Sequence, residues 1–178
     1  MTPWFSTVIK LRRSTIVVFA GLVAIAAPQA GAQASINVGI GAAVPIGSSA
    51  DRLSPGYTTT LAFAFQPNWM HNDLRLEGAV ISLAAKSAAS KKRQILSATA
   101  NVIISGKADA VPAGYVIVGA GSYQASGGIS RRTDYGVNVG AGVRFSLGFF
   151  GTFVEARLHY VADDTKTKYF PMTFGLTF

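Results

Sequence analysis

Hydrophobic residues alternate with small or polar residues through most of the chain after position 33, and this period of two predicts β-strands. The clearest example is Tyr135–Leu147, where Tyr, Val and Phe alternate with Gly, Asn and Arg. No stretch after position 33 shows the 3.6-residue period of an amphipathic helix. The alternating segments are Ser35–Gly47, Gly56–Gln66, Asp73–Leu83, Gln94–Ile104, Gly114–Tyr123, Tyr135–Leu147, Thr152–Val161 and Tyr169–Phe178.

The connections between these segments alternate between polar, charged loops and turns that are shorter or carry less charge. The polar loops are Ser48–Ser54, Lys86–Arg93, Ala125–Asp134 and Ala162–Lys168. Most segments are close to the ~9–11 residues that a tilted strand needs to cross a bilayer. Together, the even number of segments and the alternating connections predict an all-β fold: a closed, eight-stranded, antiparallel up-and-down transmembrane β-barrel.

Charge placement indicates which face of these strands points outward. A soluble, lipocalin-like barrel has the same alternation with its apolar face inside, and its outer face then carries many charged residues. Here only 13% of residues are charged, and the polar strand faces carry mostly Gly, Ser, Thr, Asn and Ala. We therefore predict an apolar, lipid-facing exterior and a narrow, crowded, polar interior.

Aromatic residues near the segment ends suit the two interfacial girdles of a membrane barrel. These residues are Tyr57, Phe65, Tyr115, Tyr135, Phe145, Phe149, Phe150, Tyr160, Tyr169 and Phe178.

Residues 1–32 have the pattern of a signal peptide. Lys10, Arg12 and Arg13 form a basic region, which is followed by the apolar run Ile16–Ala27 and then Pro28. The small residues around Ala32 predict cleavage there, and a cut after Ala34 is the alternative. An uncleaved membrane helix is less favoured because the run is shorter than the ~20 residues that span a bilayer. The exported barrel domain is then 33–178; it has no cysteine, so it must be stable without disulfides.

The C-terminal segment, from Tyr169 to Phe178, resembles the last strand of bacterial outer-membrane barrels. It ends in an aromatic residue and has hydrophobic residues at every second position before it, although Thr173 stands where that pattern often has glycine. Together with Tyr135–Leu147 and Thr152–Val161, it resembles the small outer-membrane β-barrel family related to the opacity and OmpA-like barrels. The resemblance implies an outer-membrane location. It also implies that Phe174, Leu176 and Phe178 form an assembly signal for the barrel-assembly machinery.

Charged and imidazole side chains within the strands are predicted to form an interior polar cluster. Such charges should pair, because an unpaired buried charge is costly. The sequence favours a structural plug of salt bridges over an ion path, a proton path or a gated pore, since eight strands leave no aqueous channel. The cluster consists of Arg75, Glu77, Arg144, Glu155, Arg157 and His159.

The sequence gives little support for a catalytic site or a metal-binding site. His159 could act as a base only beside a serine and an orienting acid, and no serine lies within two residues of it. His71 is far from His159 in sequence and makes no metal motif with it. We predict no catalytic residue, metal or cofactor.

The polar loops gather basic residues at one end of the predicted barrel. This basic outer rim could bind phosphates of lipopolysaccharide, or it could be ordinary solvated loop charge. Its residues are Arg52, Lys86, Lys91, Lys92, Arg93, Arg131 and Arg132, with Lys166 and Lys168 nearby.

The sequence thus predicts a non-enzymatic, monomeric outer-membrane protein with a structural or surface-interaction role in the cell envelope. Its expected partners are outer-membrane lipid, lipopolysaccharide and the assembly machinery, and no nucleic acid. A lipid-modifying enzyme and a narrow pore are the alternatives.

Overall fold

The structure is a computed structural model of the chain. It describes residues 34–86, 92–106, 112–126 and 132–178. The predicted signal peptide lies outside the described residues. None of the described residues belongs to a helix long and apolar enough to cross a membrane.

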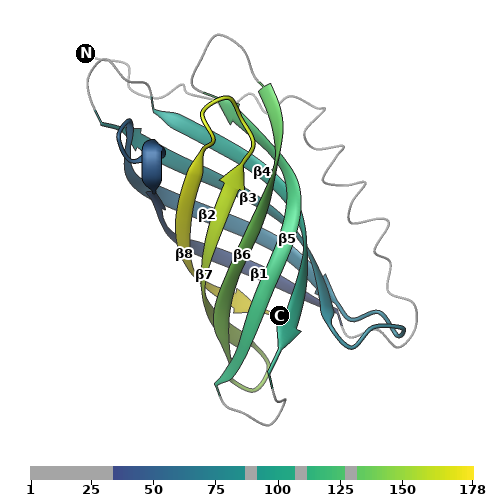
Figure 1. The fold of residues 1–178 in the computed structure, drawn as a ribbon. Coiled ribbons are helices and arrows are strands. Elements are labelled where there is room, and N and C mark those ends of the chain that lie inside the picture. The colour runs from purple at the N-terminus through teal and green to yellow at the C-terminus, as the bar shows by residue number, and fades with distance from the viewer. Residues whose placement is uncertain (1–33, 87–91, 107–111, 127–131) are drawn as a thin grey trace, which may run out of the picture.

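Eight antiparallel strands close into one barrel, in which each strand pairs with its neighbours in chain order and β1 pairs with β8 (Figure 1). The predicted closed, eight-stranded, antiparallel fold is confirmed. The strands are β1 (Ala34–Pro45), β2 (Leu53–Phe65), β3 (Asp73–Ala85), β4 (Arg93–Ser105), β5 (Ala113–Ser126), β6 (Arg132–Ser146), β7 (Gly151–Val161) and β8 (Lys168–Thr177). A short 3-10 helix, η1 (Gly47–Ser49), follows β1.

The barrel has two distinct ends. At the loop end, β1 leads through η1 into β2, and residues 162–167 connect β7 to β8. At the termini end, β1 begins and β8 finishes, and residues 147–150 connect β6 to β7. Gly148 lies in this last turn with φ +80°, a conformation that L side chains rarely adopt, so glycine suits the position.

Several strands run further toward the loop end than the sequence pattern predicts. The Ala125–Asp134 segment was expected to be a loop, yet Ala125 pairs with Arg132 and Tyr123 pairs with Asp134. Backbone hydrogen bonding continues the ladder here although the side chains are polar. Because hydrophobic alternation marks only the part of a strand with one apolar face, it does not report such extensions.

Strand β2 likewise begins earlier than predicted, at Leu53, because its first residues pair with β3 across a β-bulge between Ser54 and Gly56. At Gly56 the two strands approach closely: a Cβ there would lie 1.8 Å from the backbone oxygen of Ser82. Glycine is therefore required at this bulge for the strands to pair.

The outer face of the barrel is apolar and the inner face holds the strand charges. Outward-pointing Ile40 is 64% exposed, whereas Arg75 and Glu155 are 3% and 2% exposed. This distribution is the reverse of that in a soluble barrel and follows the predicted orientation of the alternation. Other exposed apolar side chains on the strands include Ile36, Val38, Leu61, Ile104, Val116, Val118, Val137, Val139, Met172 and Phe174.

The buried charges lie in the middle layer of the interior, and apolar clusters lie among the polar side chains on both sides of it. Toward the loop end lies a buried cluster of Ala43, Leu53, Ala79, Ile81, Leu83, Ile95, Tyr123, Val161 and Tyr169. A smaller cluster of Ile103, Tyr115 and Ile117 lies toward the termini end. Apolar groups at both ends keep water from the charged middle layer, so the barrel is filled along its axis.

Candidate functional site

Four charged side chains form the centre of the barrel interior. Arg75 Nη2 donates to Glu155 Oε1 and Oε2 at 2.8 and 2.9 Å and lies 3.2 Å from Glu77 Oε2. Arg157 Nη2 donates to Glu77 Oε1 at 2.5 Å, and Arg157 Nε lies 2.7 Å from Glu155 Oε1. Each carboxylate thus contacts both guanidinium groups, and the two positive and two negative charges cancel.

Polar side chains from three further strands complete this layer. Tyr115 Oη donates to Glu155 Oε2 at 2.8 Å. Asn101 Nδ2 lies within hydrogen-bonding distance of the Arg75 carbonyl and Thr99 Oγ1, and Asn138 Nδ2 donates to Asn101 Oδ1 at 3.0 Å. The charged centre is therefore joined to hydrogen bonds that reach across β4, β5 and β6.

Glycines on β6 make room for these long side chains. Gly140 pairs with Arg157 and Gly142 pairs with Glu155 across the β6–β7 ladder. A Cβ at Gly140 would lie 2.5 Å from Arg157 Cγ, and one at Gly142 would lie 2.4 Å from Tyr115 Cζ. The alternating glycines on the inner face thus allow the Arg157 and Tyr115 side chains to lie across the strand.

Arg144 was predicted to belong to the interior cluster, but the structure places it apart. Its side chain is 36% exposed, its Nη1 lies 3.8 Å from Asp73 Oδ2, and its guanidinium lies over the Tyr115 ring. Arg144 is close to the termini end of β6, where its long side chain reaches solvent. The interior cluster is therefore one of balanced charge, not one with an excess of arginine.

His159 lies in the interior on the loop-end side of the charged centre. Its Nδ1 is 3.0 Å from Tyr123 Oη, and its ring stacks on Tyr169 with 4.7 Å between ring centroids. Its Nε2 has no protein partner, and no serine is hydrogen-bonded to it within the described residues. The geometry therefore shows a buried aromatic stack and no serine–histidine pair.

Two aromatic residues that were assigned to the girdles lie inside the barrel. Tyr115 and Tyr169 are 6% and 0% exposed. Alternation places Tyr115 on the face of Ile117, and Tyr169 on the face of Thr173. Their position near a strand end suggested a girdle, but the side to which they point decides their surroundings. Tyr57, Tyr135, Phe149 and Phe178 do lie on the outside.

The connection between β7 and β8 is tied across the loop end of the barrel. Asp163 accepts hydrogen bonds from the backbone N–H and hydroxyl of Thr167, and its carboxylate pairs with Arg93 at the start of β4. Burial alone would raise the pKa of Asp163, but these hydrogen bonds, with the Arg93 charge, hold it below its usual value. Since β4 is not a neighbour of β7 or β8, this contact bridges the barrel mouth.

The structure describes some of the residues of the predicted basic rim. Arg52, Lys86 and Lys92 are exposed at the loop end, and Arg93 is the partner of Asp163. Lys86 Nζ donates to the Ala50 carbonyl at 2.8 Å. Lys91, Arg131 and the side chain of Arg132 lie outside the described residues.

Two lysines at the loop end lie over outward-facing tyrosines. Lys92 Nζ is 5.7 Å from the ring centroid of Tyr57, and Lys168 Nζ is 5.6 Å from that of Tyr160. Each pair places a cation directly beyond an aromatic ring at the edge of the apolar outer face. The exposed Lys166 lies in the adjacent 162–167 connection.

The C-terminal row faces outward and closes the barrel. Phe174 and Phe178 are exposed and Leu176 is partly buried. The backbones of Phe178 and Ile36 exchange two hydrogen bonds of 2.9 Å. The last residue thus takes part in the β1–β8 closure.

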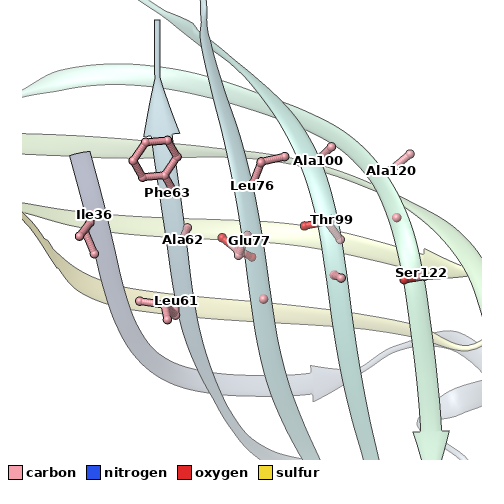
Figure 2. A pocket seen from close by; sticks show the side chains of 13 residues that line it. Ile36, Leu61, Ala62, Phe63, Leu76, Glu77, Thr99, Ala100, Ala120 and Ser122 are labelled. Carbon is pink, nitrogen blue, oxygen red and sulfur yellow. The ribbon is translucent and has the colours of Figure 1, made fainter. Parts of the chain in front are cut away.

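A depression of about 430 Å³ is lined by residues of β1 to β5. Figure 2 shows that Leu76, Ala100 and Ala120 point to the same side of neighbouring strands, and Ile36 and Leu61 are exposed apolar residues. Glu77 also lines it, but its carboxylate is bound to Arg157 in the interior. This mostly apolar lining suits hydrocarbon rather than a polar substrate. Within the described ranges, no His, Asp and Glu side chains form a group that could hold a metal.

The polar partners of the central charges, Tyr115, Asn101 and Asn138, were not predicted from the sequence. Alternation placed Asn101 and Asn138 on the inner face, whereas Tyr115 had been assigned to a girdle; the available signal was that it shares a strand face with Ile117, Gly119 and Gly121. Their mutual contacts depend on register across β3 to β7, which a single sequence does not supply. The Arg93–Asp163 contact was missed for the same reason, since it joins residues 70 positions apart.

Comparison with solved structures shows the same fold. The crystal structure of Neisserial surface protein A matches 83% of this chain and 97% of its own, with a TM-score of 0.67 and 14% sequence identity. Ail, the attachment invasion locus protein of Yersinia pestis, matches 82% of this chain and 99% of its own, with a TM-score of 0.45 and 16% identity. No family model and no curated protein matches the chain. The likeness to Neisserial surface protein A establishes the class: a small, closed, eight-stranded β-barrel.

Proposed function

We propose that this chain is a non-enzymatic outer-membrane β-barrel protein with a structural or surface-interaction role in the cell envelope. The observation that carries the proposal is the combination of an exposed apolar outer face with four buried, mutually paired charges inside. In water, exposure of so many apolar side chains would be unfavourable, whereas a lipid environment suits them.

Strand lengths agree with insertion into a bilayer. The strands contain 10 to 15 residues, and a tilted strand needs about 9–11 to span the hydrocarbon layer. Closure through β1 and β8 leaves no unpaired sheet edge in lipid, which meets the requirement that backbone groups be satisfied within the protein.

The filled interior favours a structural role over a pore. The central ion pairs and the aliphatic clusters on both sides of them occupy the barrel axis. An eight-stranded barrel has an interior just wide enough for its own side chains. In this interior His159 is hydrogen-bonded to Tyr123 and stacked on Tyr169.

We infer further that the loop end contacts anionic head groups, with lipopolysaccharide phosphates as the partner. Lys92 and Lys168 lie over outward-facing tyrosines at the edge of the apolar face, which is where a head group would meet the protein. Lysine ammonium groups bind phosphate as point charges. Exposed Arg52 and Lys86 add to the positive charge of this end.

Cysteine labelling in cells tests location and orientation together, because the chain has no native cysteine. An Asp51→Cys variant at the loop end should react with a membrane-impermeant maleimide in intact cells. An Asn68→Cys variant in the β2–β3 turn should react only after permeabilisation. Recovery of the protein in a soluble fraction, or labelling of Asn68→Cys alone in intact cells, would contradict the proposal.

Binding to lipid vesicles tests the head-group contact. Purified barrel should bind vesicles that contain phosphorylated lipid A better than vesicles with the dephosphorylated form, and salt should weaken the difference. The double variant Lys92→Ala/Lys168→Ala should reduce this difference in binding. The matched double variant Lys92→Arg/Lys168→Arg should retain it. Equal binding to both vesicles would remove lipopolysaccharide as the partner. Lipid A deacylation, or conductance in planar bilayers, would favour the enzyme or pore alternative.

A further inference from the structure

A small cavity lies inside the barrel between the charged centre and the His159–Tyr169 stack. Its volume is about 10 Å³, which corresponds to the space needed by one water molecule. The lining residues are Thr58, Thr60, Glu77, Ala79, Ile81, Arg157, His159, Tyr169, Pro171 and Thr173.

Three residues of this lining carry a buried polar atom without a protein partner. Among the described residues seven such side-chain atoms occur, and three of them are Arg157 Nη1, His159 Nε2 and Tyr169 Oη. These three side chains are at least nine-tenths buried. A buried polar group without a hydrogen bond is costly, and three around one cavity indicate a shared missing partner.

We propose that this cavity is a binding site for a single structural water molecule. The water accepts a hydrogen bond from Arg157 Nη1 and exchanges hydrogen bonds with His159 Nε2 and Tyr169 Oη. The hydroxyls of Thr58, Thr60 and Thr173 are available in the same lining. Buried waters typically make about three hydrogen bonds, which is the number of unpartnered atoms here.

The charge around the cavity favours water over an ion. Arg75 and Arg157 are balanced by Glu77 and Glu155, so the centre has no net charge to attract a counter-ion. The unpartnered N–H of Arg157 repels a cation. An anion would meet the carboxylate of Glu77 in the same lining.

The bound water links two parts of the interior directly, in addition to the side-chain hydrogen bond between Tyr123 and Asn138. On one side Arg157 belongs to the four-charge centre. On the other, His159 is bonded to Tyr123 and stacked on Tyr169. With the water in place, one continuous hydrogen-bond network extends from Glu155 to Tyr123 across the barrel.

A Tyr169→Phe substitution distinguishes a filled cavity from an empty one, because the two cases predict different changes in the unfolding equilibrium constant. Phenylalanine keeps the stack on His159 and removes only the hydroxyl. If the hydroxyl bonds to a water, its loss should raise the unfolding equilibrium constant roughly 2- to 10-fold. An unchanged or lower constant would overturn the proposal, since removal of an unpartnered buried hydroxyl is neutral or favourable. Tyr135→Phe, at an exposed position on the outer face, is the matched control and should leave the constant unchanged.

Crystallography provides a second measurement that does not depend on a variant. Diffraction data from crystals of the full barrel grown in bromide should show a single density peak in the cavity, without anomalous signal. An anomalous peak there would identify an anion and overturn the proposal, as would an empty cavity at a resolution where other buried waters are seen.

Discussion

At the level of single residues, the barrel interior is governed by the cost of burying charge. Arg75, Glu77, Glu155 and Arg157 are nearly inaccessible to water, yet each has at least two ionic or hydrogen-bonded contacts with the others. Mutual pairing offsets the loss of hydration, which two isolated charges could not achieve. The stability of the barrel should therefore depend on the completeness of this group.

Removal of one carboxylate tests this dependence. Glu155→Ala should lower the free energy of unfolding by about 3 kcal/mol, because it leaves Arg75 and Arg157 with one acid between them. Urea titration in lipid vesicles, followed by the fluorescence of Trp69, would measure it. Asp51→Ala, at an exposed loop position, is the control and should change stability by less than about 0.5 kcal/mol. Equal effects of the two substitutions would contradict the pairing.

Inner-face glycines are a second feature at this scale, because they accommodate large interior side chains. A Cβ at Gly175 would lie 2.3 Å from Phe153 Cζ and 2.5 Å from the Val38 carbonyl oxygen. By contrast, a Cβ added at Gly114 on β5 would have no other atom within 4 Å.

Gly175→Ala should therefore destabilise the barrel by about 1–3 kcal/mol through overpacking. Gly114→Ala should be neutral or slightly stabilising, since it reduces the freedom of the unfolded chain. Parallel urea titrations of the two variants would test the difference. A loss of stability in Gly114→Ala as large as in Gly175→Ala would show that steric contact is not the cause.

At the level of elements, the loop end is held by a contact between non-adjacent strands. Asp163 in the β7–β8 connection pairs with Arg93 of β4 and accepts hydrogen bonds from Thr167. Because the folded pKa of Asp163 is lowered, its contribution to stability is present above the unfolded pKa and disappears as pH falls through the folded value.

Asp163→Asn should accordingly lower the free energy of unfolding by about 1–2 kcal/mol at neutral pH. The difference between wild type and variant should stay constant down to about pH 4, the usual pKa of an aspartate, and then decrease. Unfolding titrations at a series of pH values would show this. A difference that increased on acidification would mean that the carboxylate is not stabilised by its partners.

The strand bounds differ from the sequence pattern in a way that shows which features of the fold could be predicted. Alternation identified all eight strands, because the period of two is a local property, and charge placement then indicated which face points inward. It did not predict that β5 and β6 extend through Ser126 and from Arg132, because backbone pairing there does not require an apolar face.

The sequence predicted which residues belong to the candidate site, but it did not predict which of them contact one another. Arg75, Glu77, Glu155 and Arg157 were assigned to the interior from alternation together with charge placement. Their partners could not be assigned, because Arg75 and Glu155 are 80 residues apart and meet across the barrel. The separation of Arg144 also needed the structure, since its distance from the strand end decides whether its side chain reaches water.

For the whole molecule, the reversed distribution of apolar and charged residues predicts dependence on detergent or lipid. The protein should show the circular dichroism of β-sheet in micelles and migrate differently on gels before and after heating. Both effects are expected because the closed ladder unfolds as one unit while lipid-like molecules cover the apolar face. A monomeric, folded protein in buffer without detergent would contradict the proposed membrane insertion.

The last residue of the chain takes part in the closure of the barrel. Phe178 exchanges two backbone hydrogen bonds with Ile36, and its ring is exposed on the outer face. The terminal aromatic, with Phe174 and Leu176 before it, resembles the assembly signal of outer-membrane barrels. A packing role and a signal role predict different consequences of its removal.

Deletion of Phe178 should lower the free energy of unfolding by about 1–3 kcal/mol, because it removes one large apolar group. Refolding into micelles should remain nearly normal, since no assembly machinery takes part. In cells the loss should be greater, because a barrel that is not recognised remains unfolded in the periplasm and is degraded. Phe178→Tyr, which keeps a terminal aromatic, is the control and should assemble. If the truncated protein reached the outer membrane at the wild-type level, Phe178 would have only the packing role.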